Sequence, residues 1–466
     1  MSHISARLDR LPITSVHRTA VIALAFAYFF ELGDINTFAF AAPGLVRQWH
    51  ISMHTVALVT SAGFAGMFVG ALAGGRLADI AGRRKALILS ILVYTLASLA
   101  NAFVWDVPSL VVCRFVTGIG LAMTVVANTY VSEVFPAASR GRYLSLILTI
   151  GLIGIPATAW VARALVPLAP WTWRLVFLWG ALGIVSLYFA RRMPESPRWL
   201  AQHGARQQAE QAVLTFEAAA REQYGTLAEP DARQPDEVRH DRVRYRELFT
   251  RGQRRNTFML IVVWVFQTLG AYGFLAWVPT LLVEHGFSIV RSLTYSSVIA
   301  VCNPVGAWIA SLFVERIDRK WYIAINAMAV AVFGLLFGLT FKPPLIMLFG
   351  ALVVMGLQSF VAAVYAYTPE LFPTRLRSSG HGLVYGIGRL ANAIGPLVIS
   401  LLYSSFGYQS VFVYIAVCWA LAAFAVGVFG PLTSRRPLES ITAQTDGEDP
   451  GALAATPPGQ RTFSGS

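Results

Sequence analysis

Twelve long apolar segments dominate the sequence and limit the folds that it can adopt. A helix that crosses the hydrocarbon core of a bilayer needs about 20 mostly apolar residues. The segments are continuous rather than alternating, which favours membrane-spanning helices over barrel strands. Only 13% of the residues are charged, against roughly 25% in soluble domains. We therefore predict an all-α integral membrane protein with twelve transmembrane helices, at residues 19–42, 55–77, 86–104, 109–131, 143–166, 173–190, 256–283, 292–314, 321–341, 345–367, 379–403 and 409–431.

Polar stretches divide these segments into two sets of six. Within the longest stretch, the sequence AEQAVLTFEAAAREQY is typical of a helix. The charges of that stretch fit a solvated segment under the membrane, with partner binding as the alternative. The last stretch is rich in Gly, Pro, Ser and Thr, and we expect it to be disordered. The predicted divisions are an N-terminal segment at 1–18, a six-helix bundle at 19–190, a central loop at 191–255, a second bundle at 256–431 and a tail at 432–466.

Lysine and arginine are distributed unevenly around the predicted helices. With the N-terminus in the cytoplasm, 30 of the 37 lie in cytoplasmic segments, 5 in external loops and 2 inside helices. Cytoplasmic loops of membrane proteins carry such an excess of positive charge. We therefore predict a multi-pass protein of the cell membrane with both termini in the cytoplasm. This location explains the net charge of +13 without a nucleic-acid partner.

The sequence shows no arrangement typical of an enzyme active site. It contains no nucleophile–base pattern, phosphate-binding loop or cluster with metal-ligand spacing. Cys113, Cys302 and Cys418 lie in separate apolar segments, as expected for buried thiols. We expect no enzymatic activity, no cofactor and no metal.

Two loops recur at a fixed distance along the chain. GGRLADIAGRRKA, after the second segment, matches SLFVERIDRKWYI, after the eighth. SEVFPAASRGR, after the fourth, matches PELFPTRLRSS, after the tenth, and both matches have an offset of 236 or 237 residues. Agreement between the two offsets predicts two pseudo-symmetric six-helix bundles. Parallel repeats of this kind characterise secondary transporters that bind substrate between the halves.

These loops resemble those of a known family. GRLADIAGRRK resembles the signature loop of the major facilitator superfamily, and SEVFP…RGR, PESPRWL and PELFP…R are similar to the sugar-porter branch and its organic-ion relatives. The resemblance covers roughly residues 15–432 and implies a charge cluster at the cytoplasmic face that latches the halves together while the site faces outward. Orientation signals and helix capping are the alternative explanation of these charges. The latch residues would be Asp79, Arg83, Arg84, Glu133, Arg140, Glu195, Arg198, Glu315, Arg319, Glu370 and Arg377.

The stretch FFELGDINTF places two carboxylates inside the first apolar segment. Glu31 and Asp34 lie about 60° apart on one helix face. Arg114, in the fourth segment, lies at a similar depth, and charges inside membranes usually pair or face a cavity. In sugar porters, which the chain resembles, an acid and an arginine at these positions form the proton-coupling pair. The alternative is that Asp34 and Arg114 form a purely structural ion pair. The acid-x-x-acid spacing of Glu31 and Asp34 also resembles the first helix of aromatic-acid symporters and niacin porters.

A second arginine, Arg389, lies within the eleventh segment. It could pair with Glu31, receive a substrate carboxylate or serve packing. In the major facilitator superfamily, which the chain resembles, helices 1, 4, 7 and 10 line the substrate site. For any single aromatic residue on these helices, packing is the alternative role. The corresponding candidates for substrate binding are Asn36, Met123, Asn128, Gln267, Tyr272, Trp277, Gln358, Tyr365 and Tyr367.

Together, the resemblance and the buried charges predict a secondary transporter. We expect a monomer in the lipid bilayer that couples a small organic acid, aromatic or nicotinate-like, to the proton gradient by alternating access. The seventh segment lacks the paired glutamines and following asparagine of hexose porters. A sugar or polyol porter or facilitator is one alternative, and a membrane sensor that keeps the transporter fold is another.

Overall fold

The computed structural model describes residues 2–123, 126–227, 229, 245–250, 252–313, 316–373 and 376–433. Within these residues, twelve helical stretches are long and apolar enough to cross a membrane, which confirms the predicted fold class. Apolar side chains cover the faces of these helices that would contact lipid, because no water is available there to solvate polar groups.

The first half of the chain contributes six of these stretches. They are α2 (Ser15–Trp49), α3 (Met53–Ala81), α4 (Arg83–Asn101), α5 (Val107–Met123) with α6 (Val126–Val134), α7 (Ala137–Leu165), and α8 (Trp173–Ala181) with η1 (Leu182–Val185) and α9 (Ser186–Ala190). The second half contributes the others. They are α12 (Arg254–Leu275), α14 (Ile289–Ala300) with α15 (Cys302–Phe313), α16 (Arg319–Leu339), α17 (Pro343–Glu370), α18 (Arg377–Phe406) and α19 (Tyr408–Phe429).

Five further helices of the described residues lie outside the spans. The short α13 (Val278–Glu284) follows α12, and η2 (Tyr245–Phe249) precedes it. The polar stretch between the halves forms α10 (Pro197–Gln202) and α11 (Arg206–Tyr224), and α11 confirms the helix predicted there. The N-terminal segment contains a helix that the sequence did not reveal, α1 (Ser2–Asp9). The predicted disordered tail lies outside the described residues from position 434 onward.

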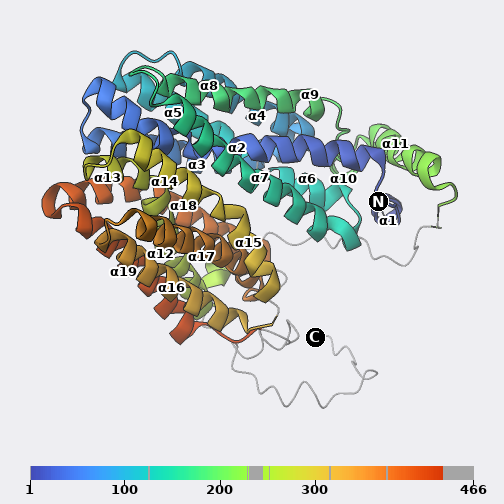
Figure 1. Ribbon diagram of the computed structural model, residues 1–466. Helices are drawn as coiled ribbons and strands as arrows, with labels where there is room; N and C mark the ends of the chain where they lie inside the picture. Colours follow the sequence, from blue (N-terminus) through green and yellow to red (C-terminus); the bar gives the residue numbers. More distant parts are fainter. Residues whose placement is uncertain are drawn as a thin grey trace.

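The two halves form separate bundles that meet through a few helix pairs. Contacts join α3 to α18, α7 to α14 and α15, and α2 to α13. Between α7 and α14, Nε of Arg163 donates a hydrogen bond to Oγ1 of Thr294 in the other half, at 2.5 Å. Figure 1 shows the bundles side by side where α13 and α14 lie, and diverging toward the end that carries α10 and α11.

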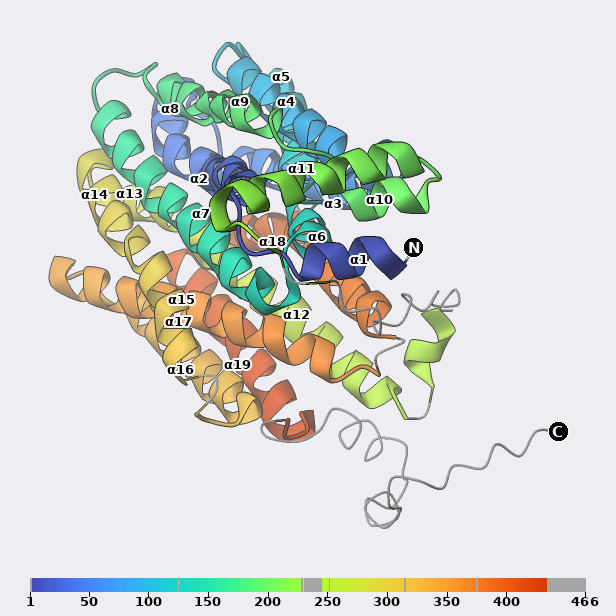
Figure 2. The ribbon, with the colours of Figure 1, turned by 90° about the vertical axis from the view of Figure 1, so that its right-hand side faces the viewer.

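Helices α1, α10 and α11 gather at one end of the first bundle (Figure 2). We call this end of the molecule the charged end. It also contains the loop between α3 and α4, the loop between α6 and α7, and the residues just before α16. The opposite end, near α13 and α14, is the joined end.

Candidate functional site

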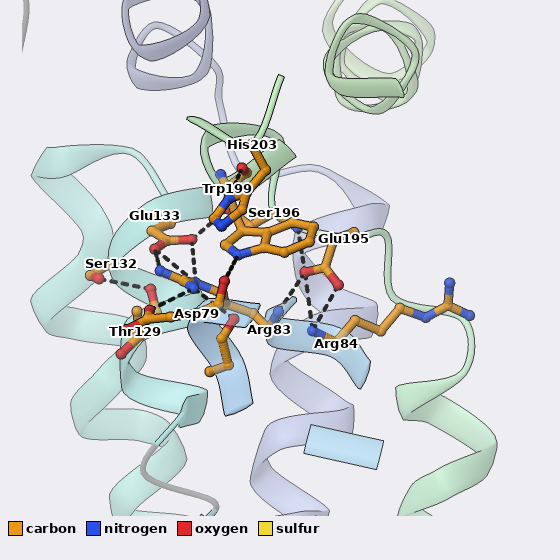
Figure 3. A network of polar contacts seen from close by, with 11 residues as sticks. Asp79, Arg83, Arg84, Thr129, Ser132, Glu133, Glu195, Ser196, Trp199 and His203 are labelled. Carbon is orange, nitrogen blue, oxygen red and sulfur yellow. Dashed lines mark hydrogen bonds and ion pairs between the residues drawn. The ribbon is translucent and has the colours of Figure 1, made fainter. Parts of the chain in front are cut away.

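At the charged end, Arg83 is the centre of a polar network in the first bundle (Figure 3). Its Nη2 donates to Oε1 of Glu133 at 2.7 Å, and its Nη1 donates to Oδ1 of Asp79 at 3.0 Å. The Arg83 side chain is 7% exposed. The hydroxyl of Ser196 donates to Oε2 of Glu133 at 2.5 Å. One arginine therefore ties the end of α3 to the end of α6.

Glu195 caps the start of α4. Its Oε1 accepts from the backbone N–H groups of Arg83, at 2.9 Å, and Arg84, at 3.1 Å. The first N–H groups of a helix have no partner within it, and a carboxylate there also interacts favourably with the helix dipole. Gly82, just before α4, has φ +99°, and a Cβ atom at this position would lie 2.4 Å from Oε2 of Glu195. The glycine of the GRLADIAGRRK motif is therefore needed for both the turn and the cap.

Two other predicted latch arginines are joined by a residue that the sequence did not indicate. Oδ1 of Asp9, the last residue of α1, accepts from Nη2 of Arg140 at 2.8 Å, and Oδ2 accepts from Nη2 of Arg198 at 3.2 Å. Asp9 thus bridges the first turn of α7 and the start of α10. The signal was weak because a single acid in a polar N-terminus has no helical or motif context.

Helix α1 is held on α11 by a buried carboxylate. Glu217 of α11 is 3% exposed and accepts from Nε of Arg7 at 2.8 Å and from Nη2 of Arg10 at 2.7 Å. The hydrogen bond from Arg7, with the contribution of Arg10, lowers the pKa of Glu217 from its ordinary 4.5 to about 2. The same contact raises the pKa of Arg7. This contact therefore stays ionised throughout the physiological pH range.

In the second bundle, Arg319 forms an ion pair with Glu370. These residues are the counterparts of Arg83 and Glu133 under the sequence repeat, so the two halves repeat an ion pair as well as a motif. Both pairs join residues of a single bundle. Glu315 and the side chain of Arg377 lie outside the described residues, so their predicted place in the cluster stays a prediction.

Inside the first bundle, the predicted pairing of Asp34 and Arg114 is confirmed. Nη1 of Arg114 lies 3.8 Å from Oδ2 of Asp34, and the two side chains are 6% and 0% exposed. Oδ1 of Asp34 accepts a hydrogen bond from the hydroxyl of Ser98 at 2.8 Å. In α8, a Cβ atom at Gly180 would lie 2.1 Å from the same oxygen, so the glycine makes room for the carboxylate. The role of the pair in proton coupling stays a prediction.

The guanidinium of Arg114 is only partly satisfied by its surroundings. It lies 5.8 Å from the ring centroid of Phe38 and 5.9 Å from that of Phe177, both within reach of cation–π attraction. Among the residues that the structure describes, its Nε and Nη1 have no hydrogen-bond acceptor. Buried N–H groups of a charged side chain nearly always have acceptors, so this group is a candidate for ligand contact.

Arg389 has a different environment. Its Nε and Nη2 donate to the hydroxyl of Tyr385 at 2.9 and 2.6 Å, and its Nη1 donates to the hydroxyl of Tyr272 at 3.4 Å. The described hydrogen bonds of Arg389 are thus made to tyrosines of its own bundle. Its pairing with Glu31, which is buried in α2, stays a prediction.

A small cavity lies between the bundles beside the Asp34–Arg114 pair. Helices α2, α3 and α5 of the first bundle and α12 of the second contribute to it. The ring of Phe64 contacts the ring of Tyr272 across the interface, with centroids 4.9 Å apart. The lining is mostly apolar with a few polar groups, as in typical sites for small molecules. It is formed by Ile35, Asn36, Phe38, Ala39, Thr60, Gly63, Phe64, Met67, Arg114, Gly118, Leu121, Tyr272 and Ala276.

Of the predicted substrate-binding residues, Asn36 and Tyr272 line this cavity. Others face neighbouring side chains instead: Gln267 donates to Thr268, Gln358 donates to Asn303, and Asn128 accepts from Tyr28. Trp277 is buried in the core, and the hydroxyl of Tyr367 donates to the carbonyl of Pro431. Tyr365 lies in a cluster of rings with Trp264, His381 and Tyr385. The side chain of Met123 lies outside the described residues.

The sequence did not single out Phe38, Phe64 or Met67 as lining residues. An apolar side chain on a membrane helix can face lipid, the protein core or a cavity. The sequence patterns of α2 and α3 do not show which of these environments Phe38, Phe64 and Met67 face. The one available signal was the nearby Asp34, which lies one turn from Phe38 on α2.

The two bundles, with a buried ion pair beside a cavity between them, define a membrane protein of the secondary-transporter class. Residues 18–444 match the family described as sugar (and other) transporter. The chain therefore belongs to this family, within the major facilitator superfamily, and is a multi-pass membrane transporter, as the resemblance of its loops implied.

Individual relatives match nearly the whole chain. The chain is 42% identical to the putative metabolite transport protein YyaJ of Bacillus subtilis, with 94% of this chain and 97% of that protein covered. It is 30% identical to the niacin transporter NiaP of Acinetobacter baylyi, with 94% and 99% covered. Among solved structures, the partially occluded inward open conformation of the xylose transporter XylE from E. coli matches with a TM-score of 0.73 at 18% identity, with 90% of this chain and 99% of that chain covered.

Proposed function

We propose that the protein is a proton-coupled symporter of a small organic anion, of the aromatic or nicotinate-like carboxylate class. The observation that carries the proposal is the buried pair of Asp34 and Arg114 beside a cavity lined by both bundles. Membrane-embedded charges are costly and usually mark substrate or proton pathways. A relative that is 30% identical is a niacin transporter, and niacin is an aromatic carboxylate.

The proton would bind and leave at the carboxylate of Asp34. Protonation neutralises Asp34 and releases Arg114 from its counter-charge, which changes the relative free energies of the outward-facing and inward-facing states. Glu31 lies on the same helix, one turn away, and is the second candidate carrier of the proton.

The charged end is proposed to be cytoplasmic, with both termini on that side, because it collects most of the lysine and arginine. The bundles meet at the joined end and diverge toward the charged end, an arrangement expected of an inward-facing transporter (Figure 1). In the outward-facing state, the Arg83–Glu133 and Arg319–Glu370 pairs would approach each other and form the latch between the bundles.

Uptake into proteoliposomes with an imposed pH gradient tests the proposal. The panel comprises labelled nicotinate, 4-hydroxybenzoate, benzoate, xylose and an organic cation. Accumulation of an acid above its external concentration, driven by a gradient that is acidic outside, is expected. Accumulation of xylose alone would instead identify a sugar porter, and absence of transport of every compound would favour a sensor.

A further inference from the structure

The two buried arginines next to the interface differ in how their donors are used. The donors of Arg389 are directed at the hydroxyls of Tyr385 and Tyr272. Arg114 is 5% exposed and lines the cavity, and two of its guanidinium nitrogens have no acceptor among the described residues. An anion that enters this cavity would therefore find uncommitted donors on Arg114 rather than on Arg389.

The contact between Arg114 and Asp34 leaves N–H donors of the guanidinium unused, and these donors could bind such an anion. At 3.8 Å, it is longer than the roughly 2.7–2.9 Å of a charge-assisted hydrogen bond. Arginine can bind a carboxylate through two parallel N–H donors, a geometry that the described contact with Asp34 does not use. The guanidinium is thus attracted to Asp34 by charge without being saturated by it.

The rest of the lining would suit a flat ring attached to that carboxylate once the cavity widens, because in this structure it has room for little more than a water molecule. Phe38, Phe64 and Tyr272 present aromatic surfaces, and Met67 presents a polarisable one. Thr60 and Asn36 also line the cavity, where the Thr60 hydroxyl donates to the carbonyl of Val56 and the Asn36 amide donates to the carbonyl of Leu32.

We infer that Arg114 is the carboxylate receptor of the substrate, so that the substrate anion and the ionised Asp34 compete for one guanidinium. This inference rests on the proposed function and assigns Arg114 a direct contact with substrate in addition to its part in proton coupling. One proton adds to the Asp34 carboxylate as one substrate carboxylate pairs with Arg114, and both leave on the other side. The charge of the occupied site then equals that of the empty site, and proton and anion favour each other's binding.

Other charged or titratable groups surround Asp34 and must be separated from it. Glu31 lies on the same helix, and Tyr94 of α4 interacts electrostatically with both acids. Arg114 approaches from α5, and α8 contributes the uncharged Gly180. A shift in the pH dependence of binding is therefore assigned to Asp34 only when Glu31→Gln leaves it in place.

Equilibrium binding to the purified full-length protein tests the inference. The probes are nicotinate, 4-hydroxybenzoate and benzoate, each compared with its uncharged amide at pH 6 and pH 8. The variants are Glu31→Gln, Asp34→Asn, Asp34→Asn with Arg114→Gln, and Asp34→Asn with Arg114→Lys. Because the first double variant replaces both charges of the pair with similar neutral side chains, it leaves neither Asp34 nor Arg114 charged without its partner, and its thermal unfolding midpoint serves as a check on folding. Arg47→Gln, at an exposed position on α2, is the control for loss of a positive charge.

We expect Asp34→Asn to bind an acid about tenfold more tightly than wild type at pH 8 and to lose its pH dependence, within the usual range for coupled sites. Adding Arg114→Gln should abolish acid binding while the weak binding of the amide persists, and Arg114→Lys should restore part of it. Acid binding by the Asp34→Asn, Arg114→Gln variant that equals that of Asp34→Asn would overturn the inference and leave Arg114 as a partner of Asp34 alone. A pH dependence that survives Asp34→Asn and disappears in Glu31→Gln would overturn it as well. If wild type binds none of the three acids, the proposed function itself fails.

Discussion

Arg114 and Asp34 face each other across the interior of the first bundle, with 3.8 Å between Nη1 and Oδ2. The arginine also borders the cavity between the bundles, whereas the aspartate accepts a hydrogen bond from Ser98 deeper in the bundle. Their arrangement places the candidate proton carrier one residue away from the candidate site. A change in the charge of Asp34 therefore acts directly on a group that lines the cavity.

The space around Asp34 depends on Gly180. A methyl group there would lie 2.1 Å from Oδ1 of Asp34 and 2.8 Å from the hydroxyl of Ser98, so Gly180→Ala must displace the carboxylate. We expect a loss of stability of about 1–3 kcal/mol, typical of overpacking, and a drop in gradient-driven uptake. Gly382→Ala on α18 is the matched control, since a methyl group there meets no atom within 4 Å. Equal unfolding midpoints and equal uptake in the two variants would contradict this description of the site.

Arg389 is expected to position Tyr272 rather than to bind the carboxylate. Arg389→Gln should weaken binding of an acid and of its amide by the same factor, about fivefold, which corresponds to one hydrogen bond of roughly 1 kcal/mol. The measurement is the ratio of acid to amide affinity. A loss confined to the acid would show that Arg389 receives the carboxylate, as one sequence-based alternative held.

The cap on α4 provides a test of the charged end. Glu195 accepts from the N–H groups of Arg83 and Arg84, so Glu195→Ala removes the cap and should lower stability by about 1–2 kcal/mol. Glu195→Gln keeps one oxygen acceptor and should therefore keep about half of the stabilisation that the cap provides. Thermal unfolding in detergent measures both, and a Glu195→Ala protein as stable as wild type would refute the capping role.

The attachment of α1 to α11 should weaken at acid pH. The pKa of Glu217 is lowered from 4.5 to about 2, so its ion pairs with Arg7 and Arg10 stabilise the attached state above about pH 4.5. This stabilisation is lost progressively as the pH falls toward 2. Hydrogen exchange should show α1 amides protected at pH 7 and less protected at pH 3, once exchange rates are corrected for pH.

Glu217→Gln is the companion variant for this experiment. It removes the titrating carboxylate while keeping an amide of similar size, so α1 should be less protected at both pH values. If α1 in this variant kept its protection at pH 7, the remaining contacts, among them the ion pairs of Arg7 with Glu210 and of Asp9 with Arg140 and Arg198, would suffice to hold the helix.

The sequence predicted the spans well because burial in lipid imposes a compositional requirement on every membrane helix. It also predicted which loops correspond, and the pairs Arg83–Glu133 and Arg319–Glu370 show that the repeat extends to contacts. The pairing of Asp34 with Arg114 followed from a physical need, since isolated charges are costly at that depth.

Other features depend on how helices rotate and on contacts between distant segments. Gln267 and Gln358 were expected at the site but donate to Thr268 and Asn303. Phe64 reaches the cavity because of the orientation of α3, which its evenly apolar sequence does not specify. The bridge from Asp9 to Arg140 spans 131 positions and has no local signature.

Uptake of nicotinate, 4-hydroxybenzoate or benzoate by wild-type and Asp34→Asn proteoliposomes tests the coupling. The account predicts that wild type accumulates an acid when the outside is acidic, and that Asp34→Asn does not accumulate it but still exchanges labelled for unlabelled acid across the membrane. Accumulation by Asp34→Asn equal to that of wild type would contradict the account, because the proton would then travel on another group.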